Sequence, residues 1–270
     1  MAQVKAIEEV LELAPDKQIS LTYPDARAMS TNARSSGNVG DNVQKAVDTE
    51  YHLIVAHKVS MAMSDRRMLT KMSVKAPEAT GIDELEVVAD RGYFTREEIK
   101  PTVDAGITPY IPKSLTSGNA PKGEIDRRDF IYLEEKDEYR CSSGESLPKQ
   151  TKTMAGTMVT YRYWSKNCGS CGLKSKCTTG KKRRVSRWKY AKVIDSHERR
   201  MEASPTMMQL RKQTVEHPFG TIKSWMGATH FKTRRLRNVG TEMALHVLAY
   251  NITRMINIMG VKPLIRATEV

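Results

Sequence analysis

Asp90 closes the run "LEVVAD" (85–90), in which nearly all of the preceding residues are apolar. The run is short enough to be a buried strand, and open α/β sheets bind their ligands at the carboxyl ends of strands. Asp90 is therefore a candidate site residue. The structural alternative is a helix cap, but Thr95 and Glu98 already match a capping box for a helix that begins near residue 96.

Glu216 is the one acid in "VEHPFGTIK" (215–223), which lies in a basic stretch with a helical pattern. Four apolar residues of this stretch are spaced by four, three and four positions, which predicts a buried stripe on a helix. Glu216 directly follows the first of them, so it borders that stripe. The structural alternative is a weak ion pair with Arg211, Lys212 or Lys223. The predicted stripe consists of Val215, Phe219, Ile222 and Met226.

Together the two acids indicate metal-dependent phosphodiester chemistry. Carboxylates from a strand end and a helix border can hold two divalent cations about 3.5 to 4 Å apart, which activate a water or a 3′ hydroxyl and stabilise the departing oxygen. Oxygen ligands favour Mg²⁺, with Mn²⁺ as the substitute. We therefore expect Asp90 and Glu216 to be catalytic metal ligands.

The charge distribution indicates a polyanionic partner. The chain carries a formal net charge of +13, and residues 151–237 hold 21 Lys and Arg against 4 Asp and Glu, so the remainder is slightly acidic. A surface with one sign of charge favours nucleic acid. A membrane surface is the alternative, but the block has no long amphipathic run with a wide apolar face. With neither a transmembrane span nor a signal peptide, we expect a cytoplasmic protein.

Four cysteines, Cys141, Cys168, Cys171 and Cys177, fall in or next to the basic block. In a cytoplasmic protein they indicate thiols or metal ligands rather than disulfides. The spacing is looser than in a standard zinc ribbon, although nearby glycines suit metal knuckles. We expect a zinc site made by all four, with buried free thiols as the alternative.

The elements that must position these residues follow from local patterns. Residues 2–13 have a helical period, and 24–42 are rich in turn formers. Two β-rich runs, 43–48 and 52–60, predict a hairpin. A helix over 65–79, the strand 85–90, the helix from 96 and a strand in 106–113 complete the order of an α/β layer with a mixed sheet.

The second half of the chain interrupts this pattern. Short β-like pieces such as "DFIYLE" and "VTYRYW" occupy residues 114–203 with the cysteines, which predicts an inserted subdomain. Helical signals return at Ser204 and Pro205. We predict a last helix over 241–259 that buries Leu245, Leu248, Ile252, Met255, Ile256 and Met259.

The motifs, taken as an ordered set, resemble those of bacterial insertion-sequence transposases with an RNase H-like DDE catalytic domain. They are "NVQKAVDTEYHLIVAHKVS", "LEVVADRGYFTREEI", "YRCSSGESL", "CGSCGLKSKCT" and "LRKQTVEHPFGTIKSWMGATHF". The resemblance implies DNA strand transfer with two Mg²⁺ ions held by Asp, Asp and Glu. It makes Asp90 the second acid, Glu216 the terminal Glu and Lys223 a DNA-contacting lysine. The expected phosphate contacts are Lys223, Arg211, Lys212, Lys181, Lys182, Arg183, Arg184, Arg187, Arg234 and Arg235.

The local patterns, together with the resemblance, predict a division of the chain into five parts. They are an N-terminal helix and loop (1–42), the first part of an RNase H-like core (43–113), a β-rich, basic, four-cysteine insertion (114–203), the C-terminal helices of the core (204–260) and a tail (261–270).

The sequence departs from the family at several positions. Tyr23 stands where an Asp is usual and Asp41 where an aromatic residue is usual, which looks like drift. The first catalytic Asp is not found: Asp25 and Asp48 lie in predicted turns, and Asp65 is expected to cap a helix. We therefore expect the first strand to be missing and the chain to be the C-terminal part of a transposase, inactive alone. A homodimer or an upstream chain would supply that strand.

Three functions remain open at this point. The leading hypothesis is a DDE transposase segment that binds insertion-sequence ends and target DNA. The second is a catalytically silent DNA-binding protein on the same fold, which predicts salt-sensitive binding without metal-dependent cleavage. The third is a zinc-stapled structural module that binds DNA weakly.

Overall fold

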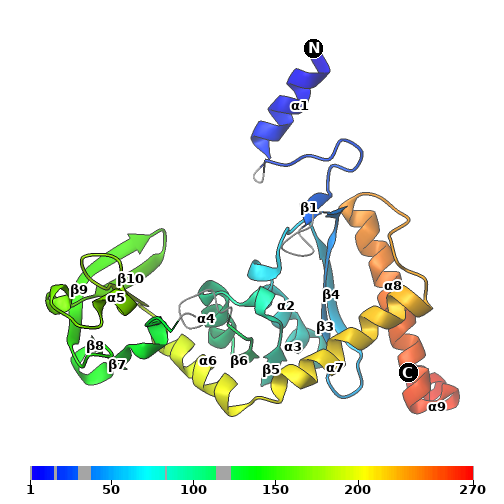
Figure 1. The fold of residues 1–270 in the computed structure, drawn as a ribbon. Helices are drawn as coiled ribbons and strands as arrows, with labels where there is room; N and C mark the ends of the chain where they lie inside the picture. Colours follow the sequence, from blue (N-terminus) through cyan, green and yellow to red (C-terminus); the bar gives the residue numbers. More distant parts are fainter. Residues whose placement is uncertain (1, 15–16, 30–37, 83, 114–122, 270) are drawn as a thin grey trace. The chain divides into compact units, whose positions relative to one another are not determined.

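The computed structural model describes residues 2–14, 17–29, 38–82, 84–113 and 123–269 (Figure 1). The chain divides into two compact units. Unit 1 combines Met1–Lys113 with His197–Val270, and unit 2 is Ser114–Ser196. Among the described helices, none has the length and apolar character needed to cross a membrane.

An antiparallel hairpin forms the first half of unit 1, and the predicted hairpin is confirmed. β3 (Asn42–Val47) pairs with β4 (Ile54–Ser60). Asp48 fixes the turn, because its Oδ2 accepts a hydrogen bond from the N–H of Tyr51 at 2.5 Å.

Helix α8 (Leu236–Met259) lies alongside β4 (Figure 1). The Asn251 side chain bonds both backbone groups of Ile54: Oδ1 accepts from the N–H and Nδ2 donates to the carbonyl, each at 2.9 Å. Asp25 accepts the first N–H of the helix, that of Leu236, at 2.9 Å. The core between hairpin and helix consists of Ile54, Val59, Ile222, Val239, Met243, Val247 and Tyr250.

The predicted buried face of α8 is wrong. Leu245 is 62% exposed and Leu248 is 55% exposed. The buried residues are Val239, Met243, Val247 and Tyr250. The helix is apolar on more than one side, so a helical period alone fits two faces, and packing against β4 decides between them.

A parallel pair forms the second half of unit 1. β5 (Leu85–Val88) and β6 (Ile107–Tyr110) are joined through α4 (Arg96–Asp104), as predicted. The predicted capping box is wrong, because the side chain of Thr95 accepts no cap hydrogen bond. The Oε2 of Glu98 instead accepts the N–H of Thr70 at 2.9 Å, which connects α4 to the helix α2 (Leu69–Ser73).

The helix predicted over 65–79 is broken into three pieces: the 3-10 turn η1 (Asp65–Arg67), α2 (Leu69–Ser73) and α3 (Lys75–Thr80). α3 ends at Gly81, whose φ of 69° is the left-handed conformation that a helix C-terminus favours. The pieces pack on the strands through Leu69, Met72 and Ala76, which are all buried.

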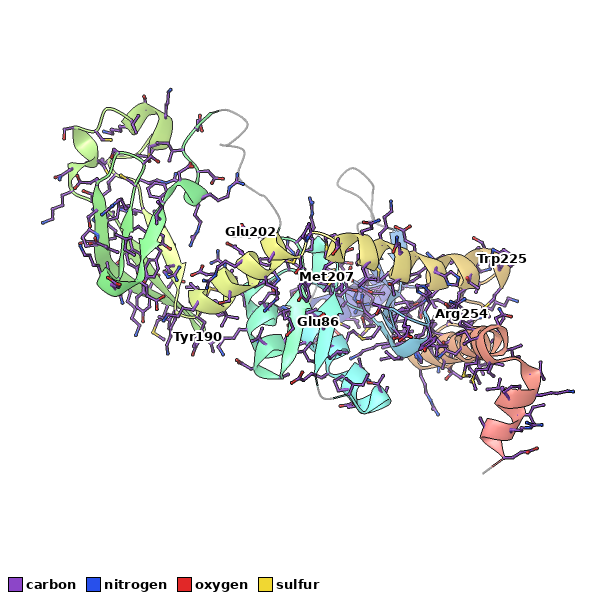
Figure 2. All side chains as sticks on the ribbon, turned by 90° about the horizontal axis from the view of Figure 1, so that it is seen from below. Glu86, Tyr190, Glu202, Met207, Trp225 and Arg254 are labelled. Atoms are coloured by element: carbon purple, nitrogen blue, oxygen red, sulfur yellow. The ribbon has the colours of Figure 1, made fainter. Side chains whose placement is uncertain are left out.

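A long helical segment, α7 (Met207–Gly220), continues directly into one π-helical turn, η7 (Thr221–Trp225). Figure 2 labels its two ends, Met207 and Trp225. The predicted start at Ser204 and Pro205 is two residues early, since Thr206 is the N-cap. α6 (Ala191–Ala203) was not predicted from the sequence. Unit 1 also contains α1 (Ala2–Leu13) and α9 (Val261–Thr268).

The predicted loop over 24–42 contains a small antiparallel pair, β1 (Arg27–Met29) and β2 (Asn38–Gly40). Residues 30–37 of that loop lie outside the described residues. Just outside the pair, the hydroxyl of Tyr23 donates to Oδ2 of Asp41 at 2.9 Å. Burial, followed by Asp41, raises the pKa of Tyr23.

This contact joins the two positions interpreted above as drift. Exchanging the two residues would exchange donor and acceptor of one hydroxyl–carboxylate hydrogen bond. The two departures from the resemblance therefore concern a single contact.

The exchange predicts a coupled effect on stability. Tyr23→Asp or Asp41→Tyr alone should each lower the free energy of unfolding by about 1–2 kcal/mol, because the first sets two carboxylates against each other and the second removes the charged acceptor. The double exchange should recover most of that loss. Urea unfolding of all four proteins as a double-mutant cycle measures the coupling; purely additive losses would contradict the compensation.

Unit 2 is a five-stranded antiparallel sheet in the order β11-β10-β9-β8-β7, with the short helix α5 (Lys174–Cys177). The predicted strands in "DFIYLE" and "VTYRYW" are confirmed as β7 and β10. The strands are β7 (Ile131–Leu133), β8 (Glu138–Arg140), β9 (Ser146–Ala155), β10 (Met158–Tyr163) and β11 (Val185–Trp188). Its core consists of Phe130, Tyr139, Leu147, Tyr163 and Val185.

The chain is thus a mixed α/β protein. In the described part of unit 1, however, β3–β4 and β5–β6 form separate two-stranded sheets. The continuous mixed sheet expected from the sequence is not formed by these strands.

Candidate functional site

Asp90 comes two residues after the end of β5, and both of its carboxylate oxygens are in use. Oδ1 accepts the N–H of Gly92 at 2.8 Å, which caps the 3-10 turn η2 (Arg91–Tyr93). Oδ2 forms an ion pair with Nη2 of Arg211 at 3.2 Å. The cap that the nearby Thr95 made less favoured for Asp90 is therefore present: Asp90 caps a turn and also faces α7.

Asp65 is the functional candidate that the sequence analysis missed. A Cβ placed on Gly92 would lie 2.9 Å from Oδ1 of Asp90 and 3.8 Å from Oδ2 of Asp65, so both carboxylates border this glycine. Asp65 does not cap η1, because Ser64 is the N-cap. Its Oδ1 instead accepts from Asn42 Nδ2 at 3.0 Å and from Gln44 Nε2 at 2.6 Å.

Two amide side chains, Asn42 and Gln44, were the feature of the sequence that could have indicated a role for Asp65. Asn42 and Gln44 are two residues apart on β3, so they lie on one face of the strand. Gln44 is only 3% exposed, and its Oε1 accepts from the hydroxyl of Tyr93. Buried amides on a strand require polar partners, and Asp65 and Tyr93 are those partners.

A cavity runs beside the two carboxylates. Its walls are residues 42–49 along β3 and 85–90 along β5, together with side chains of α2, α3 and α7. Asp65 and Asp90 line it with Arg211 and Phe219. Adjacent residues on a strand point to opposite faces of a sheet. Because consecutive residues of both strands line the cavity, it lies along the edges of these strands.

Lys45 projects from β3 into the same cavity. Its Nζ lies 3.8 Å from the centroid of the Phe219 ring, and Nζ of Lys223 lies 5.7 Å from that centroid. Burial, followed by the neighbouring Lys223, lowers the pKa of Lys45 to about 8.

Glu216 is not among the cavity residues. It is exposed, whereas Thr214, Pro218 and Ile222 are the buried residues of this segment. Five residues along a helix correspond to about 7.5 Å of rise and about 140° of rotation, so Glu216 points away from the side on which Arg211 meets Asp90. Of the four residues predicted to form a buried stripe, Ile222 is fully buried, and Val215, Phe219 and Met226 are half-buried.

Residues 140–256 match the family model described as a transposase DDE domain. This segment is a DDE-type transposase region. It contains Glu216, Arg211 and Lys223, while Asp65 and Asp90 precede it. No curated protein and no solved structure matches the chain significantly.

The basic residues of the DDE region differ in accessibility. Lys182 and Arg183 are half-buried: Nζ of Lys182 lies 4.2 Å from the ring centroid of Trp164, and Arg183 donates to the carbonyl of Cys177 at 3.2 Å. Arg211 is engaged by Asp90. The exposed residues among the predicted phosphate contacts are Lys181, Arg184, Lys212, Lys223, Arg234 and Arg235.

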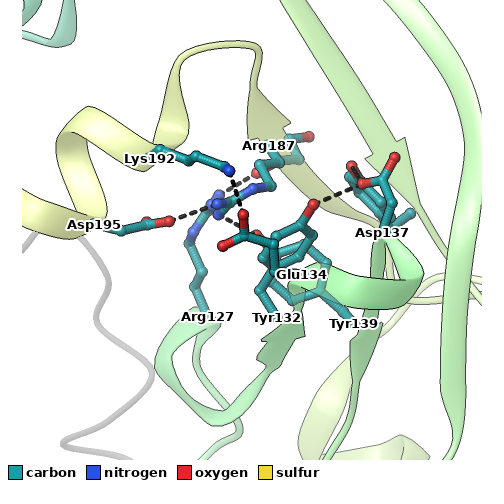
Figure 3. Close-up of polar contacts among 10 residues, drawn as sticks. Arg127, Tyr132, Glu134, Asp137, Tyr139, Arg187, Lys192 and Asp195 are labelled. Carbon is teal, nitrogen blue, oxygen red and sulfur yellow. Dashed lines mark hydrogen bonds and ion pairs between the residues drawn. The ribbon is translucent and has the colours of Figure 1, made fainter.

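Arg187 does not fit its predicted role as a phosphate contact. It is 7% exposed, its guanidinium pairs with Asp195 at 2.5 Å, and it lies 3.7 Å from the ring centroid of Tyr132 (Figure 3). It also donates to the hydroxyl of Tyr139 at 3.3 Å. These contacts join β11, α6 and the aromatic core of unit 2, so Arg187 stabilises the fold of the DDE region.

The four cysteines come together at one cavity in unit 2, and each is half-buried. Cys141 opens a tight turn, with its carbonyl accepting the N–H of Gly144 at 2.8 Å. Burial raises the pKa of the Cys177 thiol, and the other three cysteines add to the rise because neighbouring thiolates repel one another. Cys141 is remote from the other three in the sequence, and the fold brings it to the same cavity, as a site made by all four requires.

In the described part of the chain, no three His, Cys, Asp or Glu side chains stand in an arrangement that could hold a metal ion. Asp65 and Asp90 are two carboxylates at one place, and the cysteines are four thiols around one cavity.

Proposed function

We propose that this chain acts in DNA transposition, as a DDE transposase segment that cleaves and joins DNA in a metal-dependent reaction. The observation that carries the proposal is the match of residues 140–256 to the transposase DDE domain. We propose that β3–β4, β5–β6 and the C-terminal helices form an RNase H-like core. The β-rich unit 2 interrupts this core in the sequence.

Asp65 and Asp90 are the proposed metal ligands, with Glu216 as the third acid by motif. Mg²⁺ keeps several waters and is commonly bound through one or two carboxylates, so this pair fits it. Bound there, the ion would activate a water or a 3′ hydroxyl and stabilise the departing oxygen. Asn42 and Gln44 hold Asp65 in place.

Arg211 must leave Asp90 before that carboxylate can bind a metal ion, and the guanidinium is then available for a phosphate. Glu216 can join the pair only if α7 turns about its axis. The exposed lysines and arginines would bind the DNA backbone and make the affinity depend on salt.

One assay tests the proposed function. DNA cleavage, strand transfer and binding are measured in Mg²⁺ for the wild type and for Glu216→Ala. Loss of cleavage with retained binding supports the transposase reaction and a catalytic role for Glu216. Binding without cleavage by the wild type would overturn the enzymatic proposal in favour of a silent DNA-binding protein. The Arg211–Asp90 ion pair and the exposed position of Glu216 are the observations that favour this second function.

We also propose that Cys141, Cys168, Cys171 and Cys177 form a structural Zn²⁺ site in unit 2. Four thiolates are a common structural zinc set, and the ion would draw the sulfurs inward from their present positions around the cavity. The site would join the turn after β8 to the segment that contains α5, next to the aromatic core.

The expected result is about one Zn²⁺ per chain in protein purified under reducing conditions, lost in Cys168→Ser. Elemental analysis with a thiol assay measures both metal and free sulfur. Ser143→Ala is the control, because Ser143 lies beside Cys141 without being a proposed ligand. Four titratable thiols and no zinc in the wild type would contradict the site.

A further inference from the structure

Lys45 and Lys223 are two cations that share one aromatic ring. Both ammonium groups face Phe219, at 3.8 and 5.7 Å from its centroid. Within the described residues, neither forms an ion pair with a carboxylate. Phe219 thus positions two like charges that repel each other.

The nearby acids each have another partner. Asp90 is paired with Arg211, Asp65 accepts from two amides, and Glu86 accepts from the hydroxyl of Tyr110 at 2.8 Å. On β4, His57 lies opposite Lys45, and its pKa is lowered by burial, then by Lys75 and Lys45. The charged group that shifts the pKa of Lys45, after burial, is the like charge of Lys223.

A half-buried lysine without a counter-ion is unfavourable, since burial and a like charge both penalise its charged form. Its pKa of about 8 expresses that penalty. A phosphate between the two ammonium groups would replace the lost hydration with charge-assisted hydrogen bonds and cancel the repulsion. A fully exposed lysine keeps its hydration, so it does not require a phosphate to replace it.

We propose that Lys45 and Lys223, held by Phe219, form a binding site for one phosphodiester of DNA beside the Asp65–Asp90 pair. The inference rests on the proposed function for the identity of the anion. Lys45 is then a DNA contact in the wall of the cavity that Asp65 and Asp90 also line.

The test is DNA binding by Lys45→Met, which keeps the stem of the side chain over Phe219 and removes the charge. Affinity for a duplex oligonucleotide, measured by fluorescence anisotropy at several salt concentrations, should fall about tenfold. The slope of log K against log[salt] should decrease by about 0.9, the loss of one phosphate contact. Lys45→Arg should retain most of the affinity.

Lys58→Met is the matched control. Lys58 is an exposed lysine on β4, next to His57, so the substitution removes the same charge from the same hairpin. It should leave the affinity and the salt slope close to the wild-type values. Equal losses in Lys45→Met and Lys58→Met would show a general effect of net charge and overturn the site.

A second measurement covers the case in which Lys45→Met does not fold. In the wild type, NMR titration of the Lys45 ammonium should show its pKa rising when the oligonucleotide is added. An unchanged Lys45 pKa on addition of the oligonucleotide would overturn the proposal. The proposal would also be overturned if inorganic phosphate raised this pKa and DNA did not compete with the phosphate. Absence of cleavage together with Lys45-dependent binding would refute the proposed enzyme activity and leave this site standing.

Discussion

Replacing Asp90 with asparagine is expected to reduce metal-dependent DNA cleavage on the order of a thousandfold, while DNA binding persists. A metal ion supplies several kcal/mol of transition-state stabilisation, and about 1.4 kcal/mol corresponds to a tenfold change in rate. Asparagine keeps the size of the side chain and can still accept the N–H of Gly92, but it loses the charge that holds the ion. Asp65→Asn should have a similar effect.

Cleavage rates and binding constants in Mg²⁺ measure this effect, and Mn²⁺ binding by electron paramagnetic resonance gives a readout independent of turnover. Asp104→Asn is the control, because Asp104 is a carboxylate in a surface ion pair with Lys100. Unchanged Mn²⁺ binding in both Asp90→Asn and Asp65→Asn would exclude this pair as the metal site.

Acid is expected to destabilise unit 1 through His197. The side chain is 1% exposed, and its Nε2 accepts the N–H of Ile111 at 3.3 Å. Burial, followed by Arg200, lowers its pKa from 6.5 to about 4. Between these values the unfolded chain takes up a proton that the folded chain does not, so stability present above pH 6.5 is lost as the pH falls towards 4.

The expected loss is about 2–3 kcal/mol between pH 7.5 and 4.5, from about 1.4 kcal/mol per pKa unit. The free energy of unfolding in urea at both pH values measures it. In His197→Gln the glutamine can still accept the Ile111 N–H without titrating, so its pH-dependent loss should be smaller by this amount. The control His230→Gln changes an exposed histidine and should behave as the wild type does. An identical pH dependence in His197→Gln would contradict the assignment.

Local patterns were sufficient to predict many of the elements. The hairpin of β3 and β4, the strand β5 before Asp90, the start of α4 and the strands β7 and β10 each depend on a few adjacent residues. Such signals are short-range, since a strand or a helix start is set by alternation, turn formers and caps.

The tertiary partners were not predictable in the same way. Asp65 resembled a cap until Asn42 and Gln44, more than 20 residues away, were seen to bind it. Arg187 is one of many arginines in a basic run, and only the folded β-sheet shows that it is buried. For Glu216, the helical pattern gave its distance from the apolar stripe but not the side of α7 that meets Asp90.

Asn251 determines where the hairpin can be extended. A strand edge presents unpaired N–H and C=O groups that any further strand can use. At Ile54 the side-chain amide of α8 already occupies both groups, so β4 is closed to strand addition at that residue. Within the described chain, β3 pairs only with β4. An added strand would therefore enter along β3, in the gap that faces β5, and would pass beside Asp65 and Asp90.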